Sequence, residues 1–170
     1  MSTAFQLRFP AQQIDHWSER YEYDDQAAIA VVPAAKQRGS LTKEEFLAVC
    51  HWKSPRTQPR CRTNSAEFIE HTTRCALSSA SEQLRIEVLT LLRGVSWPTA
   101  SVILHFFHSE QYPIVDFRAL WSLNCDVPAQ YEYPFWQEYT QYCRNLAKES
   151  GASMRKLDRA LWQYSKEHQA

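Results

Sequence analysis

The sequence predicts an all-α protein of eight to ten helices. Apolar residues recur at helical spacing along most of the chain, and no stretch alternates polar and apolar residues convincingly as a half-buried strand would. Only three glycines occur in 170 residues, which disfavours a β fold rich in tight turns. Residues suited to helix capping precede several of the apolar-periodic stretches.

Two helices are expected before residue 40. The first begins after Pro10, a residue that is tolerated at the first position of a helix. The second spans residues 26–37, with Asp24 and Asp25 as candidate caps. Pro33 should kink or split this second helix, because proline lacks the N–H that an internal turn needs.

Two sequences of the capping-box type follow. Thr42-x-x-Glu45 should start a helix that Pro55 stops, and Asn64-x-x-Glu67 should start the next one. The segment between them, residues 55–63, holds two prolines and no apolar periodicity, so we expect it to be a loop.

The centre of the chain should form a helical hairpin, at about residues 82–108. Ser81 caps a helix that runs into Gly94, and a second helix starts at Pro98. Asp116 then stands just ahead of a third helical segment. Two further helices are expected toward the C-terminus, one from about residue 134 to Gly151 and one from Ser153 or the residue after it.

Composition narrows the functional classes. The formal net charge is zero, which weakens a nucleic-acid-binding function but leaves room for a local basic patch. The five cysteines are dispersed and never spaced C-x-x-C, so we expect neither a disulfide framework nor a metal or iron–sulfur cofactor. The chain opens on no signal-like leader and holds no apolar run of membrane-spanning length. We therefore expect a soluble, cytoplasmic protein without a membrane partner.

The turn at Gly94 can be interpreted in two ways. A helix that ends at a glycine and restarts at once leaves unpaired N–H groups at the start of the new helix, and these groups can bind a phosphate. The same spacing also fits an ordinary αα-turn. The role of Asp116 can also be interpreted in two ways, because a Pro-x-x-Asp segment before a helix is an ordinary N-cap.

The two features together resemble a known signature. L-x-G-V-S-W-P-T-A-S-V-I-L, eleven further residues and D-F-R-A-L-W-S-L are similar to the hairpin and V-D turn of the helix-hairpin-helix DNA glycosylase (HhH-GPD) superfamily. In this register the lysine position of the family falls on Pro98, and its aspartate position falls on Asp116, eighteen residues later. The match covers about a fifth of the chain. Longer motif combinations also resemble a bacterial branch of that fold that lacks the lysine and the iron–sulfur cluster.

The resemblance implies a function and residues that carry it. The function would be base excision, in which the N-glycosidic bond of a flipped base is hydrolysed and Asp116 acts as the catalytic carboxylate. Double-stranded DNA would be the partner. A backbone phosphate, with a possible monovalent cation, would bind at the hairpin, and the DNA-binding residues there would be Gly94, Val95, Ser96, Trp97 and Thr99.

Two departures from the family pattern limit this chemistry. Ser96 replaces the second glycine of the hairpin, which makes a weaker phosphate contact. Pro98 has no amine and cannot form a Schiff base, so the resemblance leaves monofunctional hydrolysis or no catalysis. The four-cysteine cluster of some relatives is absent from the sequence.

A basic run precedes the hairpin. No acidic residue occurs between Glu45 and Glu67, and the run contains the candidate DNA-binding residues Lys53, Arg56, Arg60, Arg62 and Asn64. Cations on a loop beside an aromatic residue suit phosphate contact, although an isolated basic run is usually a solvated loop.

Three further side chains are candidate functional residues. Arg118 could pair with Asp116 or reach a phosphate, and the sequence favours neither over the other. His105 and His108 flank two phenylalanines on an apolar helix with no cysteine close by in the sequence, so no metal is expected there.

The resemblance also implies one two-lobed DNA-glycosylase-like domain over residues 1–170. One helical lobe would span about residues 25–115, and the second would combine the N-terminal helix with about residues 116–170. Two alternatives stay open beside a DNA glycosylase: a non-catalytic helix-hairpin-helix DNA-binding protein, and a protein-interaction scaffold on the same fold.

Overall fold

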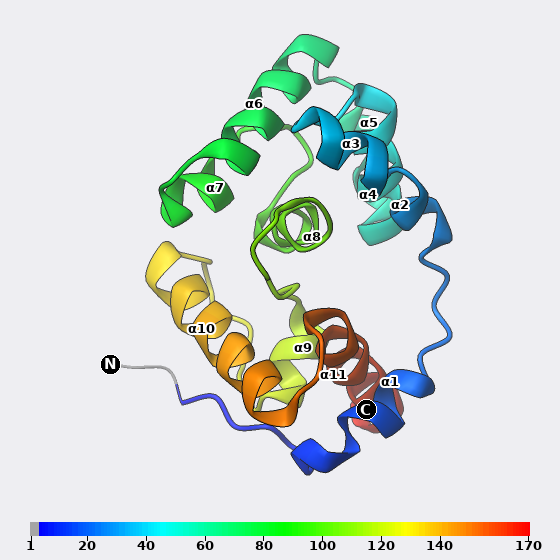
Figure 1. Ribbon diagram of the computed structural model, residues 1–170, viewed down its shortest axis with the longest axis vertical. Coiled ribbons are helices and arrows are strands. Elements are labelled where there is room, and N and C mark those ends of the chain that lie inside the picture. Colours follow the sequence, from blue (N-terminus) through cyan, green and yellow to red (C-terminus); the bar gives the residue numbers. More distant parts are fainter. Residues whose placement is uncertain (1–3) are drawn as a thin grey trace. The chain divides into compact units, whose positions relative to one another are not determined.

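All regular structure in the described part of the chain, residues 4–170, is helical in the computed structural model (Figure 1). The predicted all-α class is therefore confirmed. The described residues form eleven α-helices and two 3-10 helices, more than the eight to ten expected. Short pieces account for the excess, because the predicted helix over 26–37 is split at Val31 into α2 and α3. Pro33 lies two residues later, in the first turn of the new helix.

The chain divides into two compact units. Unit 1 contains the described residues up to Tyr23 together with Gln111–Ala170, and unit 2 is Asp24–Glu110. The resemblance had suggested limits at about residues 25 and 115. The helices of unit 1 are η1 (Ala11–Gln13), α1 (Ile14–Glu19), α9 (Phe117–Ser122), α10 (Tyr133–Ser150) and α11 (Met154–His168). Those of unit 2 are α2 (Gln26–Ala30), α3 (Val32–Arg38), α4 (Lys43–Lys53), η2 (Pro55–Thr57), α5 (Gln58–Cys61), α6 (Ala66–Ser78), α7 (Glu82–Leu89) and α8 (Trp97–Phe107).

Helix α8 is the core of unit 2. It contacts α3, α4, α6 and α7, and Figure 1 shows it end-on among them. Residues 99–104 are all buried, so the helix is enclosed on nearly every side, which explains why its sequence is almost uniformly apolar. Large side chains on the surrounding segments, including Phe46, Ile69 and Ile86, are fully buried. The N-terminus of α8, where the candidate site begins, thus projects from a packed core.

Unit 1 is built on α11, which packs against α1 and α9. The extended segment ahead of α9 is buried, and the Tyr139 hydroxyl donates to the Ile114 carbonyl at 2.6 Å. The Ser122 hydroxyl donates to the Leu161 carbonyl at 2.6 Å, which ties α9 to α11. These two bonds fix both ends of the segment that carries Asp116.

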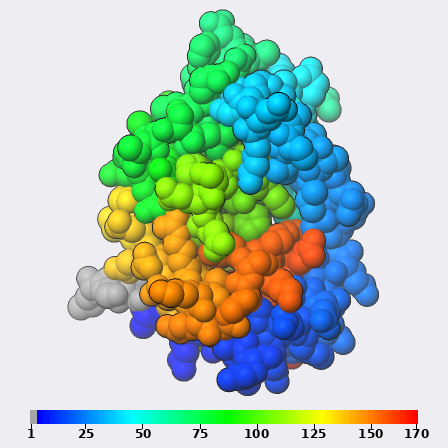
Figure 2. Space-filling model, viewed as in Figure 1, coloured from blue at the N-terminus to red at the C-terminus, as the bar shows by residue number. Residues whose placement is uncertain are grey.

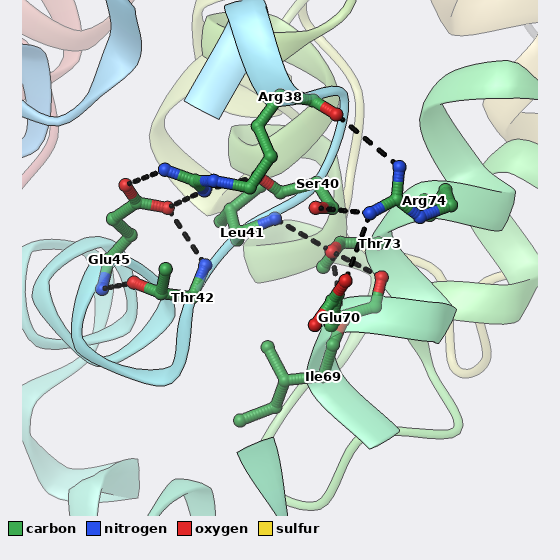
Figure 3. A network of polar contacts seen from close by, with 9 residues as sticks. All are labelled: Arg38, Ser40, Leu41, Thr42, Glu45, Ile69, Glu70, Thr73 and Arg74. Carbon is green, nitrogen blue, oxygen red and sulfur yellow. Dashed lines mark hydrogen bonds and ion pairs between the residues drawn. The ribbon is translucent and has the colours of Figure 1, made fainter. Parts of the chain in front are cut away.

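A polar network joins α3, α4 and α6 within unit 2 (Figure 3). The two terminal guanidinium nitrogens of Arg38 each donate a hydrogen bond to one carboxylate oxygen of Glu45, at 2.8 and 2.9 Å. Glu45 also accepts from the backbone N–H of Thr42, whose hydroxyl accepts from the Glu45 N–H, so the predicted capping box is confirmed. The Thr73 hydroxyl on α6 accepts from the Leu41 N–H at 2.9 Å.

Stability should depend on pH through Glu45. The hydrogen bonds from Arg38 lower the pKa of this carboxyl below its usual range, and those from Thr42 add to the shift. A lowered folded-state pKa stabilises the protein above the unfolded-state pKa of about 4.3, and that contribution is lost as the pH falls through the folded value. In urea unfolding, we expect Glu45→Gln to be less stable than wild type at pH 7 and the difference to shrink as the pH falls below about 4.3. A difference that stays constant over this range would contradict the assignment.

Two local predictions are wrong. Asn64 does not start a capping box, because Ser65 is the N-cap of α6 and its hydroxyl accepts from the Phe68 N–H. The segment 55–63 is not a loop but holds η2 and the single turn α5. Both prolines occupy early helix positions, Pro55 in η2 and Pro59 in α5, where a missing N–H costs nothing.

No helix within residues 4–170 combines the length and apolar character needed to cross a membrane.

Candidate nucleic-acid interface

The predicted hairpin is present in unit 2. Helix α7 ends at Leu89, a short turn follows, and α8 begins at Trp97. Gly94 has a φ of +83°, in the left-handed region that favours glycine, and the Val95 N–H donates to the Leu92 carbonyl at 3.1 Å. The chain thus reverses at the glycine that the sequence indicated.

The start of α8 has no side-chain cap. Ser96 is its N-cap residue, is exposed, and makes no capping hydrogen bond through its hydroxyl. Side chains do cap α4, α6, α7, α9 and α11. Because the first amides of a helix and its dipole attract anions, an exposed and uncapped start is the arrangement that phosphate binding needs.

The turn lies directly against the basic segment. A Cβ at Gly94 would lie 2.6 Å from Cys61 Sγ, 3.0 Å from Cys61 N and 3.2 Å from the Thr57 carbonyl oxygen. Only glycine allows this approach, so Gly94 is required for packing as well as for its φ angle. The contact brings η2 and α5 up to the hairpin, a proximity that sequence reasoning could not supply.

Asn64 fastens the same two segments. Its side-chain amide donates to the Cys61 and Arg93 carbonyls, each at 2.9 Å, and its carbonyl accepts from the Arg93 N–H at 2.9 Å. The residue is only 4% exposed. These bonds give Asn64 a structural role as a clamp. Its predicted contact with DNA is not needed to explain why asparagine stands here.

Exposed arginines lie on the segments that meet at the turn. Three of them come from the predicted basic run and one from the hairpin itself; together they form the arginine cluster, consisting of Arg56, Arg60, Arg62 and Arg93. Arg93 was missed by sequence reasoning, although its position beside Gly94 in the hairpin was a usable signal. Lys53 is half-buried, which makes it less accessible than the cluster.

The other hairpin candidates differ in how far their side chains can reach. Val95 is 8% exposed and Thr99 is 3% exposed, so these two could contact a ligand mainly through the backbone. Trp97 is half-buried, and Pro98 follows it in the first turn of α8. A phosphate at this turn would therefore be held by amides and by the arginine cluster.

Asp116 lies in unit 1 as the N-cap of α9. Its carboxylate accepts from the Ala119 N–H at 2.9 Å, and the residue is half-buried. Burial raises the pKa of Tyr131 to about 12, and the negative charge of Asp116 contributes to that shift. The hydrogen bond thus holds the Asp116 carboxylate in a fixed position, close enough for its charge to act on Tyr131.

Arg118 packs against α11 and against its neighbour Phe117. Its guanidinium lies near the Ser165 hydroxyl, at 3.5 Å, and packs over the rings of Phe117 at 5.0 Å and Trp162 at 5.2 Å. Within the described part of the chain it forms no ion pair with Asp116. Its cation is therefore available to an anionic ligand.

Metal binding finds no support in the described residues. Residues 4–170 hold no group of three or more His, Cys, Asp and Glu side chains placed to bind a metal. His108 accepts from the Glu110 N–H through Nδ1 at 2.9 Å, which is a structural role.

Two cysteines eleven residues apart in the sequence, Cys50 and Cys61, come together beside the hairpin. A hydrogen bond from the Cys50 thiol lowers the pKa of Cys61 to about 6, and Thr57 and Arg60 contribute to the shift. Both residues are buried. Nothing in the cysteine spacing suggested this pair.

A small pocket of about 270 Å³ opens at the opposite end of α8. It is lined by Lys36, Gly39, Leu77, Phe107 and Ser109. Figure 2 shows one end of α8, in yellow-green, reaching the surface between the blue α3 region and the green α6–α7 region. Since eleven helical residues span about 16 Å, this pocket is separate from the hairpin.

The chain resembles known proteins in structure more than in sequence. No known protein family matches the sequence, and no curated protein does. Among solved structures, the chain is similar to a Methanocaldococcus jannaschii 8-oxoguanine glycosylase/lyase in complex with a 15mer DNA containing 8-oxoguanine. The likeness has 17% sequence identity and a TM-score of 0.47, and covers 92% of this chain and 80% of the other.

Proposed function

We propose that the protein is a helix-hairpin-helix DNA glycosylase that binds duplex DNA in the cytoplasm and releases a base by hydrolysis. One observation carries the DNA-binding part of this proposal: the exposed, uncapped start of α8 is packed against a segment bearing exposed arginines. Amides and arginines around one turn suit a DNA phosphate, with a monovalent cation as a possible additional ligand of the turn.

The chemistry is assigned to Asp116. The bond between a base and its C1′ cannot be reached inside the stack, so the target nucleotide must first be extruded. A carboxylate beside C1′ stabilises the positive charge that develops as the base leaves. It also accepts a proton from the attacking water, whose oxygen forms the new bond to C1′ while the departing base takes the electron pair.

Hydrolysis alone is proposed because of Pro98. A lyase step needs an amine that attacks C1′ and forms a Schiff base, and proline in the chain offers no such amine. The product would be an abasic site in an intact strand. Duplexes that each carry one damaged base, treated with protein and then with alkali, test this directly. Strand cleavage that requires the alkali step supports the proposal, and the absence of cleavage on every duplex opposes it.

The arginine cluster should determine how strongly duplex binding depends on salt. Each phosphate contact that is lost lowers the slope of log affinity against log salt by about one unit. We expect Arg56→Ala, Arg60→Ala and Arg62→Ala combined to weaken duplex binding and to flatten this slope. Fluorescence anisotropy at several salt concentrations measures both effects.

Exposed lysines elsewhere serve as the matched control. Lys36→Ala combined with Lys148→Ala removes positive charge from other surfaces of the protein. This variant should change the slope less per charge removed. An equal effect per charge would mean that duplex DNA is attracted by overall charge rather than held at the hairpin.

A non-catalytic DNA-binding protein is the second candidate. The observation that favours it is the hydrogen bond from the Ala119 N–H to Asp116, because capping alone explains an aspartate at that position. This candidate shares the salt-dependent duplex binding but releases no base from any substrate. A protein-interaction scaffold, the third class considered, would show no binding that depends on the arginine cluster.

A further inference from the structure

A second group of cations and rings lies in unit 1 and is not used by the proposed function. It is centred on Trp162 of α11 and consists of Tyr21, Tyr23, Phe117, Arg118, Trp162 and Lys166, here called the Trp162 cluster. Tyr21 and Tyr23 lie 5.3 and 5.8 Å from the Trp162 ring, centroid to centroid. Neither helical periodicity nor the basic run indicated this group, because its members come from three separate parts of the chain.

Two cations border the central ring. The Arg118 guanidinium lies 5.2 Å and the Lys166 ammonium 5.4 Å from the centroid of Trp162. Within the described residues, neither of these cations forms an ion pair with a carboxylate. Cation–π contacts of this kind hold a charged group in place without neutralising it.

The acidic residues nearby have partners of their own. Glu167 pairs with Arg20 at 2.9 Å, and Asp158 pairs with Arg155. The hydrogen bond to Glu167 raises the pKa of Arg20, and the charge of Glu22, which lies between the two tyrosines in the sequence, adds to that shift. The two cations of the Trp162 cluster thus contact the ring without a carboxylate partner among the described residues.

Large rings of the cluster are open to solvent. Phe117 is 53% exposed and Tyr23 is 44% exposed, although burial of such large aromatic side chains would stabilise the fold. Unpaired cations beside exposed rings match the two parts of a single-stranded nucleic acid: phosphates for the cations, and unstacked bases for the ring faces. An acidic protein segment would pair with the cations but would offer no flat group to stack on the exposed rings.

We propose that the Trp162 cluster is a binding surface for single-stranded nucleic acid, with bases stacked on Tyr23 and Phe117 and phosphates at Arg118 and Lys166. The surface belongs to unit 1 alone. It is distinct from the duplex contact assigned to the hairpin, so either assignment can fail without the other.

The test uses a fluorescein-labelled fifteen-nucleotide oligothymidylate, a strand without internal base pairing, in anisotropy titrations of the whole protein. Each stacked base contributes enough that its loss weakens binding by about fivefold or more. Tyr23→Leu combined with Phe117→Leu should therefore weaken binding by at least about fivefold. Leucine keeps apolar bulk and removes the ring, so the fold is preserved. Thermal unfolding monitored by circular dichroism checks this.

Charge variants and matched controls complete the design. Arg118→Gln combined with Lys166→Gln should weaken binding and lower its salt dependence, whereas Lys36→Gln combined with Lys148→Gln should do neither. Phe68→Leu is the ring control, because Phe68 is 43% exposed but lies on α6 in unit 2. The combined Arg56, Arg60 and Arg62 alanine variant should retain oligothymidylate binding while losing duplex affinity.

Four results would overturn the proposal. They are no oligothymidylate binding by wild type, unchanged binding in the two-leucine variant, loss of single-strand binding in the Arg56, Arg60 and Arg62 variant, and equal competition by an oligoglutamate peptide. The last of these would identify the surface as a site for an acidic protein partner instead.

Discussion

Asp116→Asn is expected to lower base release by about a thousandfold, the scale of effect found when a positioned base or a charge-stabilising group is removed. Asparagine keeps the size and the capping oxygen but cannot carry the negative charge that the developing cation needs. Because asparagine caps helices about as well as aspartate, the hydrogen bond to the Ala119 N–H should persist. Single-turnover release, measured with protein in excess over a damaged duplex, isolates the chemical step.

The two roles of Asp116 can be separated by a second substitution. Asp116→Ala removes both charge and cap, and should cost about 1 kcal/mol of stability that the asparagine variant retains. Base release should be equally low in both variants. If asparagine released base as fast as wild type, Asp116 would be a helix cap only, and the non-catalytic DNA-binding function would be favoured.

Gly94→Ala is expected to have the largest effect on stability, about 2–4 kcal/mol. A side chain at a φ of +83° is strained, and this methyl would also lie 2.6 Å from Cys61 Sγ, closer than real contacts allow, and in tight contact with the Thr57 carbonyl oxygen at 3.2 Å. The turn can relieve the clash only by moving away from α5. Duplex affinity should therefore fall together with stability, since the amides and the arginine cluster would separate. Urea unfolding and duplex anisotropy measure the two effects.

Gly39 provides the matched control. It has a similar φ of +75°, but a Cβ there would meet nothing within 4 Å. Gly39→Ala should cost only the conformational strain, about 1–2 kcal/mol, and should leave duplex affinity unchanged. Equal losses in the two variants would show that the contact of Gly94 with Cys61 contributes nothing to the hairpin.

The sequence predicts this fold well where one short-range rule governs. The capping box at Thr42, the cap at Ser81 and the cap at Asp116 are all confirmed, because each depends on a hydrogen bond to a residue three positions away. The prediction that the segment 55–63 is a loop is wrong because it also relied on a short-range rule. Its prolines were interpreted as helix breakers, whereas they occupy helix starts that are stabilised by packing against the hairpin.

The candidate site was less predictable, because its parts meet through tertiary contacts. The hairpin glycine and the basic run could each be found in the sequence, but not the contact of Gly94 with Cys61 or the clamp made by Asn64. The sequence offers Asp116 as a local partner for Arg118, whereas two contacts that Arg118 makes, with Ser165 and Trp162, lie more than forty residues away. Side chains that act across such separations leave no local pattern.

Detection of the released base tests the central proposal most directly. Wild-type protein would be incubated with duplexes that each carry one damaged base, and free base would be identified by liquid chromatography and mass spectrometry. We expect one class of base to appear with wild type and not with Asp116→Asn, and the strand to stay intact until alkali is added. No free base from any duplex would contradict a glycosylase function, and strand cleavage without alkali would contradict hydrolysis without a lyase step.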